Sequence, residues 1–378
     1  MARIPYSRQS IGEDDIRAVA KALRSPFITQ GPTIPAFESA LARYSGARYA
    51  VVFSSGTAAL HAAYAAAGIG KGDEVVMPAL TFVATGNAAL YLGAKPVFAD
   101  CDEETGNVDP RNVVKKLTRR TKAIVAVDFA GLPADLTALR AIARKHRLVF
   151  IEDGAQSLGA VYKGKPLGTQ ADMTMFSFHP VKSITTGEGG VIVTNNKRYF
   201  EYLTMFRTHG MTKIRKKLRD KSRAGWHQEA QLLGNNYRLT DIQAALGLSQ
   251  LKKLDRFIVQ RRAAAKRYFP LLKNMPGVVL PPRSGLNTSA CHLFVVRVDK
   301  RIRDRVFEGL RAKGIGVQVH YLPVYLHPYY RDLGYRTGLC PTAERISLSE
   351  LSIPLYPALS LKDQKYVVNT LRDILKNL

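Results

Sequence analysis

The sequence contains few cysteines and no long apolar run, and each shortage excludes a class of protein. Only three cysteines occur in 378 residues, and they show neither metal-ligand spacing nor an even disulfide framework. We therefore expect the protein to have no metal site and to reside in the reducing cytoplasm. No apolar run approaches the roughly 18 to 20 residues that span a bilayer, and the first residues, MARIPYSRQSIGEDD, have no hydrophobic signal region. A membrane protein and a secreted disulfide scaffold are not expected.

Acidic residues are also scarce, at 30 against 56 lysines and arginines, which gives a net charge of +26. This field favours anionic partners such as nucleic acid, nucleotides or phosphorylated cofactors. The densest basic tract is KIRKKLRDKSR, Lys213 to Arg223, whereas the other cations are spread along predicted helices, as is typical of a solvated face. Aromatic residues do not interleave with the tract as a single-strand binding groove requires. No nucleic-acid partner is expected, but nucleic-acid binding is the rival function that the charge raises.

Short β-branched runs alternate with helical patterns through the first two thirds of the chain. Strands are predicted at YAVVFS, DEVVMP, KPVFAD, AIVAVD, LVFIED, MTMFSF and GVIVTN. Apolar strands separated by helices predict an α/β fold with a largely parallel sheet covered on both faces. No helical pattern separates the last two runs, which allows one of them to be antiparallel.

The length of the chain predicts two domains. A long helical pattern, YRLTDIQAALGLSQLKKLDRFIVQRRAAAKRYFPLL, leads into a smaller α/β unit made of HLFVVRV, RDRVFEGLRAKG, VQVHY and a C-terminal helix. We place the boundary near residues 250 to 260. The expected division is a large domain of residues 1–250 and a small C-terminal domain of residues 251–378.

The run FSSGTAALHAA passes from a predicted strand through small hydroxylated residues into a predicted helix. A helix N-terminus of this kind offers free N–H groups and a favourable dipole to a phosphate. An ordinary N-cap by Ser55 or Thr57 fits the residues equally well. The run matches neither the P-loop nor the GxGxxG fingerprint, which weakens mononucleotide and dinucleotide hypotheses.

Two further polar features follow predicted strands. VFIEDGAQSLGA ends a buried strand with Glu152 and Asp153, and a carboxylate there needs a partner because burying an unpaired charge is costly. Lys182 follows FSFHPV, and a lysine at this position can contact phosphate, act as a nucleophile or simply be solvated. Helix capping remains an alternative role for Asp153.

Together these three features match the needs of one cofactor. Pyridoxal 5′-phosphate requires an anion seat, an amine for its aldehyde and a carboxylate beside its pyridine nitrogen. All three occur at predicted strand ends, where open α/β sheets bind ligands. The sequence therefore predicts a pyridoxal 5′-phosphate site.

The order of the motifs resembles that of the sugar aminotransferases of the DegT/DnrJ/EryC family. The resemblance covers almost the whole chain, from IPYSRQSIGEDDI to LSIPLYPALS. It rests on the motifs SSGTAALHAA, MPALTFVATGNAALYLGAKPVFAD, IEDGAQSLGA, FSFHPVKSITTGEGG and LGNNYRLTDIQAALG. It implies the fold type I architecture of the aspartate aminotransferase superfamily, with a large domain and a smaller C-terminal domain.

The resemblance also implies residue roles. Lys182 would bind the cofactor covalently and then act as general acid and base in a 1,3-proton shift. Asp153 would pair with the pyridine nitrogen, Gln156 would approach the ring hydroxyl, and Phe82 would stack on the ring. From the residues alone, Phe82 is as readily a core side chain.

Other implied roles concern the phosphate and the quaternary structure. Thr57, Ala58 and Ser177 would hold the phosphate, the first two through the start of the helix. Asn236 would reach the phosphate from the neighbouring subunit, so the active site would lie at the interface of a homodimer. A turn residue is the alternative reading of Asn236.

The family transfers an amine, usually from L-glutamate, to a nucleotide-linked keto-sugar and releases 2-oxoglutarate. One branch replaces the cofactor-binding lysine by histidine and dehydrates sugars. Because Lys182 is present, the resemblance implies amine transfer. The alternatives left open are a dTDP or GDP sugar, or amination at a 3-keto position.

Several stretches are similar to the branch that aminates carbon 4 of UDP-2-acetamido-2,6-dideoxy-β-L-arabino-hex-4-ulose in pseudaminic acid biosynthesis. They are YSRQSIGEDDIRAV, SPFITQGP, FSFHPVKSITTGEGG, GVQVHYLPVY and AERISLSELSIPLYPALS. The residues that would contact the sugar nucleotide are Tyr6, Pro26, Phe27, Ile28, Thr29, His320 and Tyr321. The basic tract Lys213–Arg223 is either a charged flap or an attractor of the diphosphate.

Overall fold

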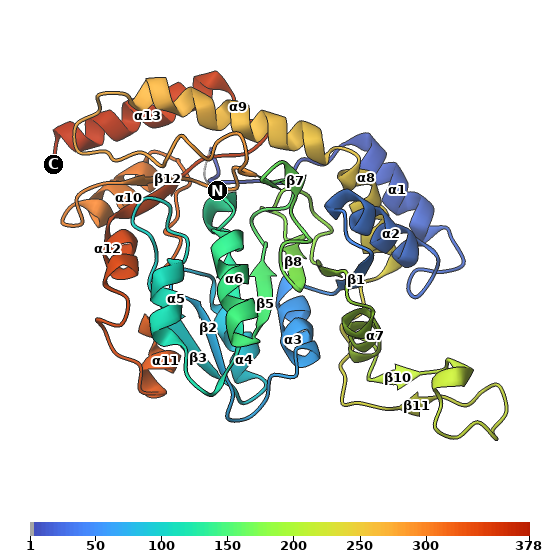
Figure 1. The fold of residues 1–378 in the computed structure, drawn as a ribbon. Helices are drawn as coiled ribbons and strands as arrows, with labels where there is room; N and C mark the ends of the chain where they lie inside the picture. Colours follow the sequence, from blue (N-terminus) through green and yellow to red (C-terminus); the bar gives the residue numbers. More distant parts are fainter. Residues whose placement is uncertain (1–3) are drawn as a thin grey trace.

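In the computed structural model, which describes residues 4–378, the chain is built around a seven-stranded sheet with strand order β1-β9-β8-β5-β4-β2-β3 (Figure 1). The strands are β1 (Tyr49–Phe53), β2 (Glu74–Pro78), β3 (Lys95–Ala99), β4 (Thr121–Val127), β5 (Val149–Asp153), β8 (Met173–Ser177) and β9 (Gly190–Thr194). All seven predicted strands are present. Strand β9 is antiparallel to both β1 and β8, and the other pairings are parallel.

Alternate residues of each strand are buried on opposite faces of the sheet. Val51 packs into one hydrophobic cluster and Val52 into the other, and both are fully buried. Burying such a side chain stabilises the fold by about 1.5–3 kcal/mol. The first face is covered by α3 (Gly56–Ala66), α4 (Val83–Leu90) and α7 (Lys197–Phe206), and the second by α2 (Thr33–Ser45), α5 (Pro110–Lys116), α6 (Leu136–His146) and α8 (Asp241–Leu251).

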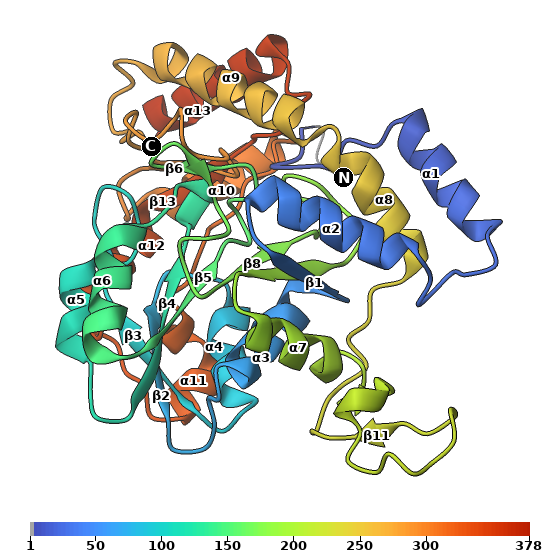
Figure 2. The ribbon, with the colours of Figure 1, turned by 45° about the vertical axis from the view of Figure 1, so that its right-hand side comes forward.

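The predicted long helix is wrong in one respect, because the chain breaks it into α8 and α9 (Leu254–Leu272). At the break, Lys253 forms ion pairs with Asp14 and Asp15 of α1 (Glu13–Leu23). Helix α8 packs against α1 and α2, whereas α9 lies beside α13 (Leu361–Lys376) (Figures 1 and 2). The two helices that replace the predicted long helix therefore pack against different parts of the chain.

The C-terminal part has a third buried cluster, which also receives Ile4 from the start of the described chain. Strands β12 (Phe294–Arg297) and β13 (Glu350–Ile353) pair antiparallel within it. The VQVHY run contributes only an isolated bridge between Gln318 and Ser352. The remaining helices here are α10 (Arg303–Ala312), α11 (Pro328–Asp332), α12 (Pro341–Ser349) and the single turn η3 (Val324–Leu326).

The basic tract belongs to an arm that projects from the body of the molecule (Figures 1 and 2). Its base is the antiparallel pair β10 (Met211–Thr212) and β11 (Glu229–Ala230), with the turn η2 (Arg215–Lys217) between them. Trp226 on the arm is 72% exposed. The arm has little apolar packing of its own, so its side chains are available to another surface.

Smaller elements complete the described chain. They are the turn η1 (Phe129–Gly131) and the pair β6 (Val161–Tyr162) and β7 (Lys165–Pro166). The three cysteines are buried and unpaired, and burial raises the pKa of each thiol. Within residues 4–378, no helix combines the length and apolar character needed to cross a membrane.

Candidate active site

A cavity of about 480 Å³ lies where β4, β5 and β8 end. This is the carboxyl edge of the parallel strands, the usual ligand position in open α/β sheets. Nine of the predicted site residues line it together: Tyr6, Thr57, Phe82, Asp153, Gln156, Ser177, Lys182, His320 and Tyr321. Residues from both ends of the chain thus meet in one cavity.

Lys182 sits in the connection between β8 and the antiparallel β9. The ends of this connection are tied together, because Phe178 N–H donates to the Gly189 carbonyl at 2.9 Å. Thr185 Oγ1 donates to the Phe178 carbonyl at 2.9 Å, and Gly187 turns the backbone with a φ of +79°. The threonines and glycines after Lys182 therefore build a short, fixed turn, which holds the lysine at the cavity wall.

Burial is the main influence on the Lys182 amine and lowers its pKa from 10.5 to about 8. The Asp153 carboxylate acts in the opposite direction, and the Arg261 guanidinium adds to the lowering. Near pH 8 a large fraction of this amine is therefore neutral. A neutral amine is a nucleophile and a proton acceptor, which an ordinary surface lysine is not at this pH.

Asp153, at the end of β5, is 4% exposed. Burial raises the pKa of its carboxyl, while hydrogen bonds oppose that rise. Thr85 Oγ1 donates to Oδ2 at 2.8 Å, and Ala155 N–H donates to Oδ1 at 3.1 Å. Thr81 Oγ1 lies 2.9 Å from Thr85 Oγ1 and completes the chain of hydroxyls. The carboxylate is thus buried yet supported, as a partner for a cationic group requires.

The start of α3 faces the end of β8. Ser55 caps the helix, and its Oγ accepts from Ala58 N–H at 3.1 Å. A Cβ on Gly56 would lie 3.2 Å from the Ser177 side chain, and one on Gly190 would lie 2.7 Å from the Ser55 carbonyl oxygen. These glycines let the helix start approach Ser177 closely. The first N–H groups of α3 and the Ser177 hydroxyl form a seat for an anion.

Gln156 bridges the two parts of the chain across the cavity. Its Oε1 accepts from Ala130 N–H at 2.8 Å, and its Nε2 donates to Tyr321 Oη at 2.8 Å. The Tyr321 ring lies 6.2 Å from the ring of Phe82, centroid to centroid. Phe82 is 57% exposed at the mouth, so it is not a core side chain.

Tyr6 and His320 form the other side of the cavity, with ring centroids 5.6 Å apart. The Nδ1 atom of His320 lies 2.8 Å from Ser352 Oγ. Burial, with a smaller contribution from Lys182, lowers the pKa of His320 to about 3. The imidazole is therefore neutral at physiological pH and can act only as a hydrogen-bonding group there.

Six predicted residues lie outside the lining of this cavity: Ala58, Asn236 and the four residues Pro26–Thr29. The N–H of Ala58 is taken by Ser55. Asn236 forms an isolated bridge with Thr208 at the base of the arm, and Thr29 forms one with Thr240. The segment Pro26–Thr29, in which Phe27 is 55% exposed, thus lies beside the chain that follows Asn236. In one copy of the chain, neither segment lines the cavity that contains Lys182.

The structure adds residues that the sequence patterns do not indicate. Thr85, Glu188 and His292 line the cavity. Thr81 precedes α4 and Thr85 lies in its first turn, so their contact depends on how the chain enters the helix. His292 carries no sequence signal, and its contribution depends on the folding of the C-terminal part over the sheet.

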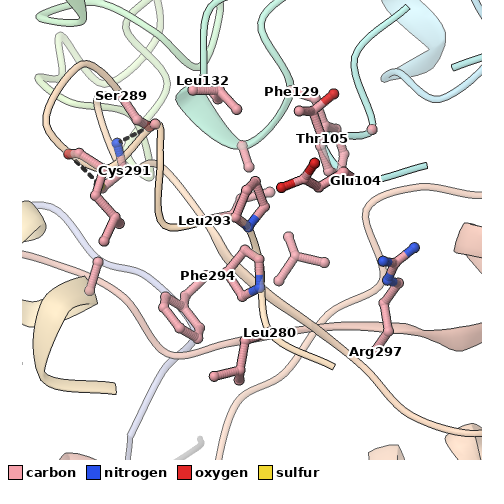
Figure 3. Close-up of a pocket in the computed structure, with 18 of the residues that line it drawn as sticks. Glu104, Thr105, Phe129, Leu132, Leu280, Ser289, Cys291, Leu293, Phe294 and Arg297 are labelled. Carbon is pink, nitrogen blue, oxygen red and sulfur yellow. Dashed lines mark hydrogen bonds between the residues drawn. The ribbon is translucent and has the colours of Figure 1, made fainter. Parts of the chain in front are cut away.

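A second cavity, of about 80 Å³, lies on the other side of the segment Cys291–Leu293, which contains His292 (Figure 3). Cys291 and Leu293 line it, while His292 between them lines the active-site cavity. Its other labelled walls include Phe129 and Leu132 on one side and Leu280 and Phe294 on the other. No predicted site residue lines this smaller, mostly apolar space.

The larger cavity fits pyridoxal 5′-phosphate. The amine of Lys182, the buried carboxylate of Asp153 and the anion seat formed by α3 and Ser177 all open into it. The buried carboxylate is the most specific of these observations, because such a group needs a cationic partner. A protonated pyridine nitrogen would supply that partner.

Comparisons with known proteins agree with this chemistry. The profile described as the DegT/DnrJ/EryC1/StrS aminotransferase family matches residues 9–372. The chain is 38% identical over 379 residues to the spore coat polysaccharide biosynthesis protein SpsC of Bacillus subtilis. The alignment covers 99% of this chain and 97% of that protein.

Two solved structures extend the comparison. Helicobacter pylori PseC, an aminotransferase involved in the biosynthesis of pseudoaminic acid, has a TM-score of 0.91 and 33% identity, covering 99% of this chain and 100% of its own. Spr1654 of Streptococcus pneumoniae, solved in its PMP form, has a TM-score of 0.92 and 30% identity, covering 99% of this chain and 98% of its own.

Proposed function

The chain belongs to the DegT/DnrJ/EryC1/StrS family of pyridoxal 5′-phosphate-dependent sugar aminotransferases, and on this basis we propose that it aminates carbon 4 of a UDP-linked 4-keto-6-deoxy sugar. The substrate proposed is UDP-2-acetamido-2,6-dideoxy-β-L-arabino-hex-4-ulose, with L-glutamate as the donor and 2-oxoglutarate as the by-product. The similarity to PseC supports this sugar. The fold is fold type I, as in the related aminotransferases.

The meeting of Lys182, Asp153 and the start of α3 in one cavity carries the proposal. When bound, pyridoxal 5′-phosphate supplies an aldehyde that exchanges amines and a ring that accepts electrons from the bond broken beside it. Lys182 Nζ would bind the aldehyde carbon and later accept and deliver the proton. Asp153, which accepts a hydrogen bond from Thr85, would also accept one from the ring nitrogen.

The remaining residues would orient the reactants. The start of α3 and Ser177 would hold the phosphate, Phe82 would cover one ring face, and Gln156 would reach the ring hydroxyl. Holding the amine and the carbonyl in one geometry supplies much of the rate advantage in such a reaction. The neutral His320 and the adjacent Tyr321 would hydrogen-bond to the sugar without adding charge.

A homodimer with shared active sites is part of the proposal. Asn236 bridges to Thr208 and Thr29 bridges to Thr240, and neither residue lines the cavity of its own chain, which supports a role in the cavity of a partner. We also propose the division into residues 1–250 and 251–378, since the C-terminal part has its own buried cluster. The cytoplasm is the proposed location, because the three thiols are unpaired.

Amination is tested with the purified protein, the UDP-linked keto-sugar and L-glutamate, with the product identified by mass and by NMR of carbon 4. Lys182→Ala should lose at least about a thousandfold in rate, since it removes both the covalent anchor and the proton carrier. Borohydride should fix the cofactor to the peptide that contains Lys182. Lys197→Ala, at an exposed lysine, is the matched control and should retain both properties.

A panel of dTDP, GDP and 3-keto sugars decides the alternative substrates. Faster turnover of one of these would replace the proposed sugar without changing the reaction class.

Hybrid dimers test whether each active site is shared between two subunits. Mixing inactive Lys182→Ala and Asn236→Ala chains should restore about a quarter of the activity, because half of the dimers then carry one intact site. No recovery after verified exchange of subunits would contradict sharing.

A further inference from the structure

Arg261, on α9, is a buried guanidinium without an anionic partner. It is 1% exposed, and within residues 4–378 no carboxylate forms an ion pair with it. Its Nε has no hydrogen-bond acceptor there either. Burial lowers its pKa from 12.5 to about 10, so it remains charged at neutral pH. A buried charge of this kind is costly and is rarely kept without a role.

The guanidinium contacts four backbone carbonyls instead. Nη2 donates to the carbonyls of Val181 at 3.3 Å and Lys182 at 3.4 Å. Nη1 donates to the carbonyls of Leu355 at 3.1 Å and His292 at 3.4 Å. One side chain therefore joins the turn that carries Lys182 to two segments of the C-terminal part, one of which lines the active-site cavity.

Only arginine can make this set of contacts with a single side chain. Its planar fork has five N–H donors and no acceptor, whereas glutamine has two donors and lysine has three on one nitrogen. The four carbonyl dipoles give partial compensation to the buried charge. They do not neutralise it, so the positive charge is felt by groups nearby.

Lys182 lies between opposite charges. Asp153, on β5, favours its ammonium form, and Arg261 disfavours it. The other titratable groups that line the cavity or interact with Lys182 are His179, Glu188, His292, His320, Tyr6 and Tyr321. Burial lowers the pKa of each of the three histidines, which reduces their positive charge at neutral pH. Arg8 lines a small neighbouring pocket together with Lys182 and Arg261, but Arg261 is the cation whose charge lowers the Lys182 pKa.

We propose that Arg261 is a positioning residue for Lys182: its guanidinium fixes the lysine-bearing turn against the C-terminal part and places an unpaired, buried positive charge behind that turn. The inference rests on Lys182 being the cofactor-binding amine and is independent of the sugar. It also explains why α9 places a charge in an otherwise apolar interior.

Labelling of Lys182 in the cofactor-free protein tests the electrostatic part. An amine-selective reagent is applied across a pH series, and the peptide that contains Lys182 is quantified by mass spectrometry. Arg261→Gln keeps two donors but removes the charge, so the labelling midpoint should move up by about one pH unit, a roughly tenfold lower rate near neutral pH. Arg261→Lys keeps the charge and should leave the midpoint close to that of the wild type.

Hydrogen exchange of residues 178–189 tests the mechanical part. Both variants should exchange faster there than the wild type, because neither reproduces the four-carbonyl contact. Arg262→Gln is the matched control: Arg262 also donates to carbonyls, those of Ser289 at 2.8 Å and Thr288 at 3.3 Å, but it does not contact the turn. It should change neither measurement.

A folded Arg261→Gln protein with wild-type labelling and wild-type exchange would overturn the proposal. If Arg261→Gln does not fold, Arg261→Lys decides it, since unchanged exchange in that variant would exclude the positioning role. Neither measurement uses a sugar or bound cofactor. A wrong substrate in the proposed function would therefore leave both results intact.

Discussion

Thr85 Oγ1 donates a hydrogen bond of 2.8 Å to Oδ2 of Asp153, across 68 residues of sequence. Burial raises the pKa of the Asp153 carboxyl, and the Thr85 hydroxyl is the main group that opposes the rise. The hydrogen bond between these two residues therefore extends to lower pH the range in which the Asp153 carboxylate is ionised. A cationic ring nitrogen is attracted only by the ionised form.

Thr85→Val should weaken the binding of pyridoxal 5′-phosphate by roughly tenfold or more, because a hydrogen bond to a charged group contributes about 1.5–3 kcal/mol. Without the hydroxyl, the Asp153 pKa rises further, so the loss should grow as the pH falls. Absorbance titration of cofactor-free protein at several pH values measures it. Thr194→Val, whose hydroxyl donates to the Asp172 carbonyl, is the control, and an equal loss there would refute the specific role.

Gly190→Ala should disrupt the anion seat. The added Cβ would lie 2.7 Å from the Ser55 carbonyl oxygen and 2.8 Å from Gly56 N, so the start of α3 must move away from Ser177. We expect cofactor affinity to fall by at least about tenfold, since phosphate contacts at a helix start depend on close backbone approach. Equilibrium dialysis measures the affinity. Gly225→Ala on the arm, where nothing lies within 4 Å, should bind as the wild type does.

His320 should make the protein less stable in acid. Its folded-state pKa of about 3 lies below its ordinary value of 6.5. Below pH 6.5 the unfolded chain therefore binds a proton that the folded chain refuses. Lowering the pH from 6.5 to 5 should cost about 2 kcal/mol of unfolding free energy through this residue.

In His320→Asn, which can still bond to Ser352, the drop in stability between these pH values should be smaller by about that amount. Urea unfolding at the two pH values gives the difference. His146→Asn, at an exposed histidine, should show the same drop as the wild type. An identical drop in His320→Asn would show that this histidine is not held neutral by the fold.

The exposed cations of the arm should strengthen binding of the nucleotide diphosphate. Replacing Lys213, Lys216, Arg219 and Lys221 by Ser should raise the KM for the sugar nucleotide about three- to tenfold at low salt, with kcat nearly unchanged. The increase should shrink as ionic strength rises. Steady-state kinetics at two salt concentrations measure both effects.

The control removes four cations elsewhere, with Lys300, Lys362, Lys365 and Lys376 changed to Ser. These residues are exposed in the C-terminal part, and their loss gives the same change in net charge. A KM that rises equally in both variants would assign the effect to overall charge. A KM that stays constant in the arm variant would leave the tract as a charged flap.

The sheet was predictable because its strands are short apolar runs, most of whose residues are buried. The missing helix after MTMFSF allowed one of the last two strands to be antiparallel, since a parallel neighbour needs a long crossover, and the structure shows that this strand is β9. The break between α8 and α9 was not predictable. Lys252 and Lys253 are compatible with a helix, and the ion pairs of Lys253 with α1 exist only in the folded chain.

Some residues of the candidate site could likewise be predicted from the sequence, and others could not. Lys182 and Asp153 were predicted as site residues because Asp153 ends a strand run and Lys182 follows one, which is a local property of the sequence. Thr85 and Arg261 act across 68 and 79 residues, so only the folded chain shows what they contact. Likewise, the family resemblance predicts a role for Asn236, but the fold is needed to see that it does not line the cavity of its own chain.

The three buried thiols can report which part of the protein unfolds first. Cys101 and Cys340 lie where α12 is capped by Asp100 at the end of β3, and Cys291 lies in the segment that Arg261 holds. A thiol reagent reacts with the thiolate, and burial both hides each sulfur and raises its pKa. The order in which the three sulfurs react therefore records, without any added label, whether the molecule opens first at its β3 edge or beside the turn that carries Lys182.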